Sequence, residues 1–163
     1  MQPIDKKEVL AALHARLLAS LESLTASQKA VQAGAVHPEA RQEHPKDTRS
    51  TEAGYLARGL AERVETLRDG IRALALLPVR DLGSDDVAVP GALVTLIDDD
   101  GEEALYLLAP AGGGERLAIA GRDILVLTPQ SPLGAAIAGR RRGDAVEVDL
   151  PSGRLRAELA RVG

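Results

Sequence analysis

Residues 10–31, LAALHARLLASLESLTASQKAV, decide how the first half of the chain folds. Apolar residues recur there at steps of three, four or seven, at Leu10, Leu13, Leu17, Leu21, Leu24 and Val31. This period is typical of an α-helix that buries one face. Few strong helix breakers precede Gly34, so the pattern predicts one long helix that ends near that glycine.

A second stripe with the same period follows, at Leu56, Leu60, Val64, Leu67, Ile71 and Leu74. Thr48, Ser50 or Thr51 could cap this helix, with Glu52 in its first turn, and Pro78 would close it. The intervening segment, 34–48, contains two prolines and predicts a turn. Two striped helices bury their stripes most simply against each other. We therefore predict an antiparallel coiled-coil-like hairpin over residues 1–78, with its tip at about 35–50.

After a predicted linker at 79–86, the hydrophobic period changes to two, which indicates β-strands. The predicted strands are 92–97, 103–108, 124–128, 145–150 and 154–159, with room for one more before 124. The last two strands alternate apolar and polar residues, so one sheet face should be solvated. Ser131 followed by Pro132 predicts a short helix to Gly139. The fold class is α+β, with a C-terminal domain at 87–163.

Composition limits the function. The chain of 163 residues has a net charge of -4 and no cysteine, which excludes disulfides and thiolate metal sites. Lys and Arg number 12 against 10 Asp and Glu over residues 1–80, but 8 against 14 over residues 81–163. The acidic C-terminal part argues against general nucleic-acid binding and favours a protein partner. The N-terminus resembles no signal sequence, and no stretch approaches a membrane span. We expect a cytoplasmic monomer.

Several motifs have a structural and a functional interpretation. The acidic run 98–103 lacks calcium-loop spacing and predicts a hairpin turn. The glycines at 112–114 lack the residues of a phosphate loop. Arg140, Arg141 and Arg142 could contact RNA or an acidic protein surface, although such runs are more often solvated. In the predicted tip, His37 and His44 lie among acidic residues but match no zinc spacing.

Four C-terminal motifs together resemble a known family: VTL at 94–96, SPLGAAIAG at 131–139, GDAVEV at 143–148 and PSG at 151–153. They are similar to the C-terminal domain of the Gre transcript-cleavage and elongation factors of bacterial RNA polymerase. The resemblance implies an FKBP-like domain that docks on the rim of the polymerase secondary channel while the hairpin enters it. Ser131 and Pro132 would contact the polymerase, with Gln130 in place of a usual acidic residue.

The resemblance also implies a role for the tip. In the family, tip carboxylates help the polymerase to hold a second Mg²⁺ that activates water near the RNA 3′ end. Here Asp47 is the plausible carry-over, as a catalytic residue sharing that ion, with Glu43 and Glu52 as substitutes. Alignment on Tyr55 instead places Thr48 and Thr51 at the acidic positions. The protein would have no cofactor of its own.

Three functional hypotheses follow. The first is a polymerase-binding elongation factor that stimulates cleavage of backtracked RNA, with the polymerase as the enzyme. The second is a channel-binding inhibitor or regulator without cleavage activity. The third is an interaction module whose hairpin binds another protein.

Overall fold

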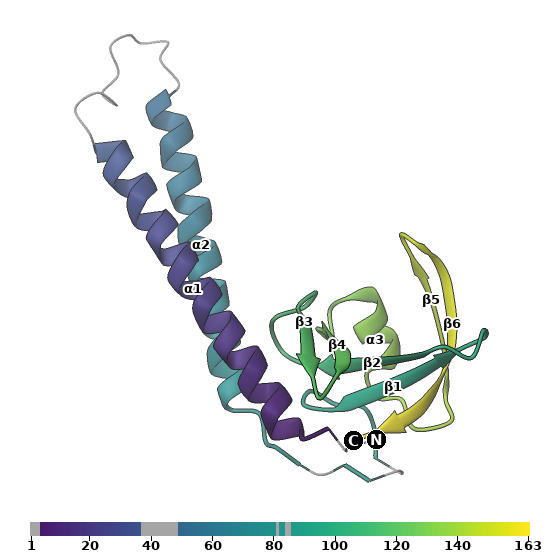
Figure 1. The fold of residues 1–163 in the computed structure, drawn as a ribbon. Helices are drawn as coiled ribbons and strands as arrows, with labels where there is room; N and C mark the ends of the chain where they lie inside the picture. Colours follow the sequence, from purple (N-terminus) through teal and green to yellow (C-terminus); the bar gives the residue numbers. More distant parts are fainter. Residues whose placement is uncertain (1–3, 37–48, 81, 84–85) are drawn as a thin grey trace. The chain divides into compact units, whose positions relative to one another are not determined.

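The computed structural model describes residues 4–36, 49–80, 82–83 and 86–163. These described residues contain three helices and six strands. Their order is α1 (Lys6–Val36), α2 (Arg49–Ala75), β1 (Leu93–Asp98), β2 (Glu103–Leu108), β3 (Arg116–Ile119), β4 (Arg122–Leu127), α3 (Pro132–Ile137), β5 (Ala145–Leu150) and β6 (Gly153–Val162). Figure 1 shows two long helices followed along the chain by a sheet, which is the order that the sequence predicts.

The chain forms two compact units. The hairpin unit is Arg16–Ile71, and the β unit combines Met1–Ala15 with Arg72–Gly163. Both long helices therefore extend into the β unit, whereas the sequence pattern placed the domain boundaries at residues 78 and 87. Within the hairpin unit, α1 and α2 lie side by side and run in opposite directions (Figure 1).

The first helix begins at a cap that the sequence analysis did not identify. The backbone N–H of Lys7 donates to Oδ1 of Asp5 at 2.9 Å, and the N–H of Val9 donates to the carbonyl of Asp5 at 3.1 Å. The Asp5 carboxylate thus satisfies one of the amides that an α-helix leaves unpaired at its start. At the other end α1 continues through Gly34 to Val36, within two residues of the end predicted near Gly34.

The hydrophobic stripes are confirmed at the base of the helices. Leu13 and Leu17 of α1 and Val64 and Leu74 of α2 are buried. The prediction that Leu56 belongs to the buried stripe is wrong, because this residue is 56% exposed. From Val64 toward the start of α2, the half-buried face continues through residues 60, 57 and 53. Residue 56 lies next to this face and outside it.

Burial in the hairpin unit decreases away from the base. Among described residues 18–34 and 51–63, no side chain is fully buried, although Leu21, Leu24 and Leu60 are half-buried. Helix α2 starts at Arg49, so Ser50 and Thr51 lie inside it and are not its caps. The helix ends at Ala75, before Pro78, as predicted.

The sequence reading predicted no membrane span, but α1 contains one candidate segment. By length and composition alone, Lys6–Gly34 is apolar enough to cross a membrane. Core helices of non-membrane proteins and signal sequences pass the same test, so a single such helix is weak evidence for a span. Arg16 and Glu22, both exposed, interrupt its apolar character.

The six strands form one sheet in the order β3-β4-β2-β1-β6-β5. All neighbouring pairs are antiparallel except β2 and β4, which run parallel with Tyr106 opposite Leu125. The pairing of β1 with β6 shifts between Thr95 and Leu96, where Arg161 and Leu159 are the partners, so Ala160 forms a bulge. Every predicted strand is present within a few residues, and the additional one before residue 124 is β3.

One face of the sheet and α3 share a core, in which the largest fully buried side chains include Leu96, Leu108, Ile137 and Leu159. The predicted solvated face is confirmed for β5 and β6, where exposed Glu147 and Asp149 alternate with inward residues. It is wrong for β1, whose first four residues are all buried. A strand covered on both faces, such as β1, loses the alternation that β5 and β6 keep with one face solvated.

Candidate functional site

The predicted contact loop leads into α3, and its geometry starts from Ser131. This residue is the N-cap of α3, with extended backbone angles of φ -71 and ψ 151. Its hydroxyl accepts from the N–H of Gly134 at 3.1 Å and donates to the carbonyl of Thr128 at 2.7 Å. Because the hydroxyl is used on both sides within the loop, Ser131 fixes the shape of this surface.

Gly134 allows the helix to approach the preceding strand. A Cβ atom built at this position would lie 1.9 Å from the carbonyl oxygen of Thr128 and 2.8 Å from Ser131 Oγ. No side chain fits at these distances, because the first neighbour is backbone and cannot rotate away. The glycine in the SPLG motif is therefore a steric requirement of the loop.

The residues on either side of Ser131 form the outer surface of the loop. Gln130 and Pro132 are exposed, whereas Ser131 is half-buried and Leu133 packs into the core. The loop thus presents an amide and a proline ring from a rigid backbone. Of the three predicted contact residues, Gln130 and Pro132 are exposed, whereas the Ser131 hydroxyl is bonded within the loop, and their contact with a partner stays a prediction.

The predicted tip residues divide differently. Asp47 and Glu43 lie outside the described residues, together with His37 and His44. Glu52 is described, and it is exposed in the first turn of α2, where a carboxylate is favoured by the partial positive charge of the helix N-terminus. Its proposed role as a substitute for Asp47 stays a prediction.

Close to Glu52, α2 carries an exposed pair that the sequence analysis did not identify as a surface feature. Tyr55 is 66% exposed and Leu56 56% exposed, and the guanidinium carbon of Arg58 lies 6.0 Å from the centre of the Tyr55 ring. Large apolar side chains that stay exposed are candidates for contact with a partner. No signal in the sequence marked this pair, because the spacing of four between Leu56 and Leu60 placed Leu56 on the predicted stripe.

The acidic run between β1 and β2 is a hairpin turn, as predicted. Oδ1 of Asp98 accepts from the backbone N–H groups of Asp100 at 3.0 Å and of Glu102 at 2.9 Å. The Asp98 carboxylate therefore stabilises the turn itself. Within the described part of the chain, no group of three or more His, Cys, Asp or Glu side chains could hold a metal ion.

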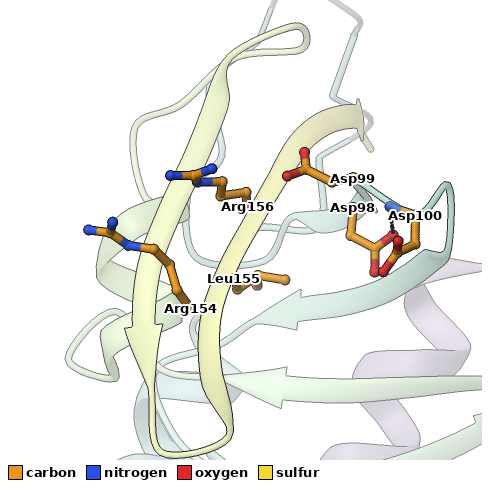
Figure 2. A pocket seen from close by; sticks show the side chains of 6 residues that line it. All are labelled: Asp98, Asp99, Asp100, Arg154, Leu155 and Arg156. Atoms are coloured by element: carbon orange, nitrogen blue, oxygen red, sulfur yellow. Dashed lines mark hydrogen bonds between the residues drawn. The ribbon is translucent and has the colours of Figure 1, made fainter.

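A cavity of about 440 Å³ lies between this acidic turn and the start of β6, lined by Asp98, Asp99, Asp100, Arg154, Leu155 and Arg156. Figure 2 shows the two arginine side chains directed away from the aspartates. Nε of Arg154 lies 3.1 Å from Asp149 Oδ1, and Nε of Arg156 lies 3.1 Å from Glu147 Oε1. Both cations are thus neutralised by β5, which leaves this cavity without a free positive charge for an anion.

A second hollow, of about 380 Å³, lies where β2 meets the β3–β4 hairpin and includes Tyr106 and Arg116. Burial raises the pKa of the Tyr106 phenol, and the nearby Arg116 partly opposes this effect. The phenol therefore stays protonated at neutral pH and is able to donate a hydrogen bond. No residue of this hollow was predicted as a site.

Comparisons with known proteins identify what the β unit is similar to. The model of the family described as "Transcription elongation factor, GreA/GreB, C-term" matches residues 83–163. Transcription elongation factor GreA of Azorhizobium caulinodans is 35% identical over 100 residues, which cover 61% of this chain and 60% of that protein. The chain thus spans about 60% of the length of the first curated relatives that it matches.

Two further matches extend over the helices. Transcription elongation factor GreA of Sphingopyxis alaskensis is 28% identical over 157 residues, covering 94% of this chain and 92% of that protein. The crystal structure of GreA factor homolog 1 of Thermus thermophilus is 22% identical and covers 93% of this chain and 95% of that chain, with a TM-score of 0.40. The sequence match to the Sphingopyxis protein therefore includes both the helices and the sheet.

Proposed function

We propose that this chain belongs to the GreA/GreB family, whose C-terminal model matches residues 83–163, and is a transcription elongation factor that binds bacterial RNA polymerase. In this proposal the β unit docks on the rim of the polymerase secondary channel, and the hairpin enters the channel and modulates elongation. The polymerase remains the enzyme. The protein acts in the cytoplasm as a monomer and reaches the RNA 3′ end only through its tip.

The observation that carries this proposal is the rigid loop at the start of α3. The Ser131 hydroxyl and the close approach at Gly134 fix the backbone, so Gln130 and Pro132 are already positioned for a partner. A surface that is ordered before binding loses little conformational entropy when the complex forms. This loop lies inside the segment that matches the family model.

The lengths of the two helices also support the proposal. At 1.5 Å per residue, the 31 residues of α1 extend about 46 Å and the 27 residues of α2 about 40 Å. Helices of this length are able to carry a tip far from their own base. A function that needs reach, such as entry into a channel, accounts for such an arm.

Binding of the labelled full-length protein to core RNA polymerase tests the docking loop. Pro132→Ala should weaken binding by about fivefold or more, since a contact at an interface centre is worth about 1 kcal/mol or more. Pro151→Ala, at another exposed proline of the same unit, is the matched control and should bind like the wild type. If the folded wild-type protein does not bind at micromolar concentration, the polymerase proposal is wrong and the hairpin serves another protein partner.

The tip favours a second form of this function. Only Asp47 matches a family carboxylate, and alignment on Tyr55 places Thr48 and Thr51 at the acidic positions. Carboxylate oxygens are needed to share a Mg²⁺ ion with the polymerase, and Asp47, Glu43 and Glu52 would supply them. With fewer ligands than the family pattern, the protein would instead occupy the channel as a regulator without stimulating cleavage.

A backtracked elongation complex distinguishes the two forms. Release of short 3′ RNA upon addition of the protein with Mg²⁺, and its loss in Asp47→Ala but not in the control Asp99→Ala, would establish cleavage stimulation through Asp47. Binding without RNA release would establish the regulator. Equal cleavage by the wild type and by Asp47→Ala would show that our assignment of Asp47 is wrong.

A further inference from the structure

The three consecutive arginines after α3 lie on a turn whose backbone is fixed. We call residues 139–143 the arginine turn. On one side the N–H of Gly139 donates to the carbonyl of Ala88, and the N–H of Ala88 donates to the carbonyl of Arg140, both at 2.8 Å. On the other side the N–H of Gly143 donates to the carbonyl of Leu159 at 2.8 Å. The turn is therefore tied to the chain on both sides.

Glycines at both ends define the shape of this turn. Gly139 has a φ of 78 and Gly143 a φ of 87, in the left-handed region that side chains with a Cβ rarely adopt. Between them the N–H of Arg141 donates to Asp144 Oδ2 at 2.8 Å, and the N–H of Asp144 donates to the carbonyl of Arg141 at 3.1 Å. All three arginine side chains are exposed on this rigid support.

Two of these cations have no partner within the described part of the chain. Arg140 and Arg142 form no side-chain hydrogen bond or ion pair with any described residue. Arg154 and Arg156 of the same unit, by contrast, pair with Glu147 and Asp149. The charges of Arg140 and Arg142 are therefore available to a partner, whereas those of Arg154 and Arg156 are already neutralised.

The surroundings of the turn favour an acidic protein segment over a nucleic acid. Residues 81–163 carry 14 acidic against 8 basic side chains. Asp144 lies next to the turn, and Val87, which follows exposed Asp86, bridges to Arg141. A nucleic acid needs an extended basic face, and these aspartates limit the basic surface to the turn itself. A short acidic segment requires only a few guanidinium groups, which match carboxylates in geometry.

We propose that Arg140 and Arg142, displayed by the arginine turn, form a docking site for an acidic segment of a protein partner. The site lies beyond the C-terminal end of α3, whereas Gln130 and Pro132 lie at its N-terminal end. It is thus separate from the surface on which the proposed function rests. The two guanidinium groups bind carboxylates, and the ordered turn keeps the entropic cost of binding low.

The test uses the full-length protein and two fluorescent probes of equal charge, an oligoglutamate peptide and an oligothymidylate. The wild type should bind oligoglutamate more tightly than oligothymidylate, and binding should weaken as ionic strength rises. Arg140→Gln combined with Arg142→Gln should reduce oligoglutamate affinity about tenfold. The matched control is Arg154→Gln combined with Arg156→Gln, which removes the same charge from the same unit and should change affinity less than twofold.

Amide chemical shifts locate the probe, and changes at residues 139–144 are the expected result. Equal losses in both double variants would show a general charge effect and would overturn the proposal. Tighter binding of oligothymidylate at the turn would also overturn it, in favour of nucleic acid. Because the peptide probe involves no polymerase, failure of this proposal is distinguishable from failure of the proposed function.

Discussion

The hairpin unit and the β unit differ in how strongly each position is constrained. In the β unit, twelve residues share one buried core, and the loop before α3 leaves no space for a single additional carbon at Gly134. In the hairpin unit, described residues 18–34 and 51–63 contain no fully buried side chain, and Gly54 has open space around it. The β unit therefore restricts its sequence, whereas the outer hairpin permits change.

This difference bears on how freely each unit can change in sequence. The GreA/GreB model describes a C-terminal domain and matches residues 83–163, the part with close packing and fixed turns. In the outer hairpin, by contrast, the sequence has to maintain only helix propensity and a loose apolar stripe. Function at the tip can thus diverge without loss of the fold.

The same substitution in the two units should have opposite effects. Gly134→Ala places a Cβ against the Thr128 carbonyl and should destabilise the protein by about 3 kcal/mol or more. Gly54→Ala meets no atom and improves helix propensity, so it should stabilise by about 0.5 to 1 kcal/mol. Urea unfolding followed by circular dichroism measures both. Equal destabilisation by the two variants would contradict the contrast between the units.

Leucine truncation should give the next largest difference. Leu159 is fully buried in the core, so Leu159→Ala should cost about 2 to 5 kcal/mol. Leu56 is mostly exposed, so Leu56→Ala should change the unfolding free energy by less than about 0.5 kcal/mol. Calorimetric melting of both variants provides the measurement. A loss of several kcal/mol in Leu56→Ala would restore Leu56 to the hairpin stripe.

Two serine hydroxyls sharpen the comparison at a smaller scale. Ser131→Ala removes the cap of α3 and should cost about 1 kcal/mol. Ser27, in the exposed middle of α1, donates only to the carbonyl of Ser23, four residues earlier, at 3.1 Å. Ser27→Ala should therefore be neutral or slightly stabilising. Thermal unfolding measures the stability of both variants. An equal loss of stability in Ser27→Ala and Ser131→Ala would contradict the expected difference.

The two tyrosines, one in each unit, predict the smallest effect. Burial raises the pKa of Tyr106 in the folded protein, so the unfolded chain loses its phenolic proton first as pH rises. The resulting stabilisation is present below the ordinary value near 10 and is lost as pH rises through the folded value. Tyr106→Phe should thus lose less stability than the wild type between about pH 9 and 11. Tyr55→Phe is the control in urea unfolding, and identical slopes for wild type and Tyr106→Phe would contradict this role for Tyr106.

The elements that the sequence predicted well are those with local signals. The β5 strand alternates clearly, and the Ser-Pro pair marks the start of α3, because a hydroxyl cap and a proline at the first position act within a few residues. Gly34 marks the end of α1 only to within two residues, because an exposed glycine costs a helix about 1 kcal/mol and does not stop it by itself. Leu56 was assigned to the stripe because it lies four residues before Leu60, but in the structure residue 57, three residues before Leu60, lies on the half-buried face.

Other features depend on partners far along the chain. The parallel pairing of β2 with β4 cannot be read from either strand, since β3 lies between them in sequence. For the candidate site, the sequence suggested Gln130, Ser131 and Pro132 and predicted that Ser131 caps α3, but it did not reveal the second hydrogen bond, from the Ser131 hydroxyl to the Thr128 carbonyl. Asp47 and Glu43 stay predictions, because they lie outside the described residues.

The position of β1 between β2 and β6 has a consequence for the order of folding. β1 pairs with β2 across a short turn. Its other edge pairs with β6, which comes last in the chain, so that Val94 lies opposite Val162. Contacts between distant residues close large loops before they gain stability, and they form slowly. The helices form from local contacts within microseconds. The helices should thus form before the sheet is complete.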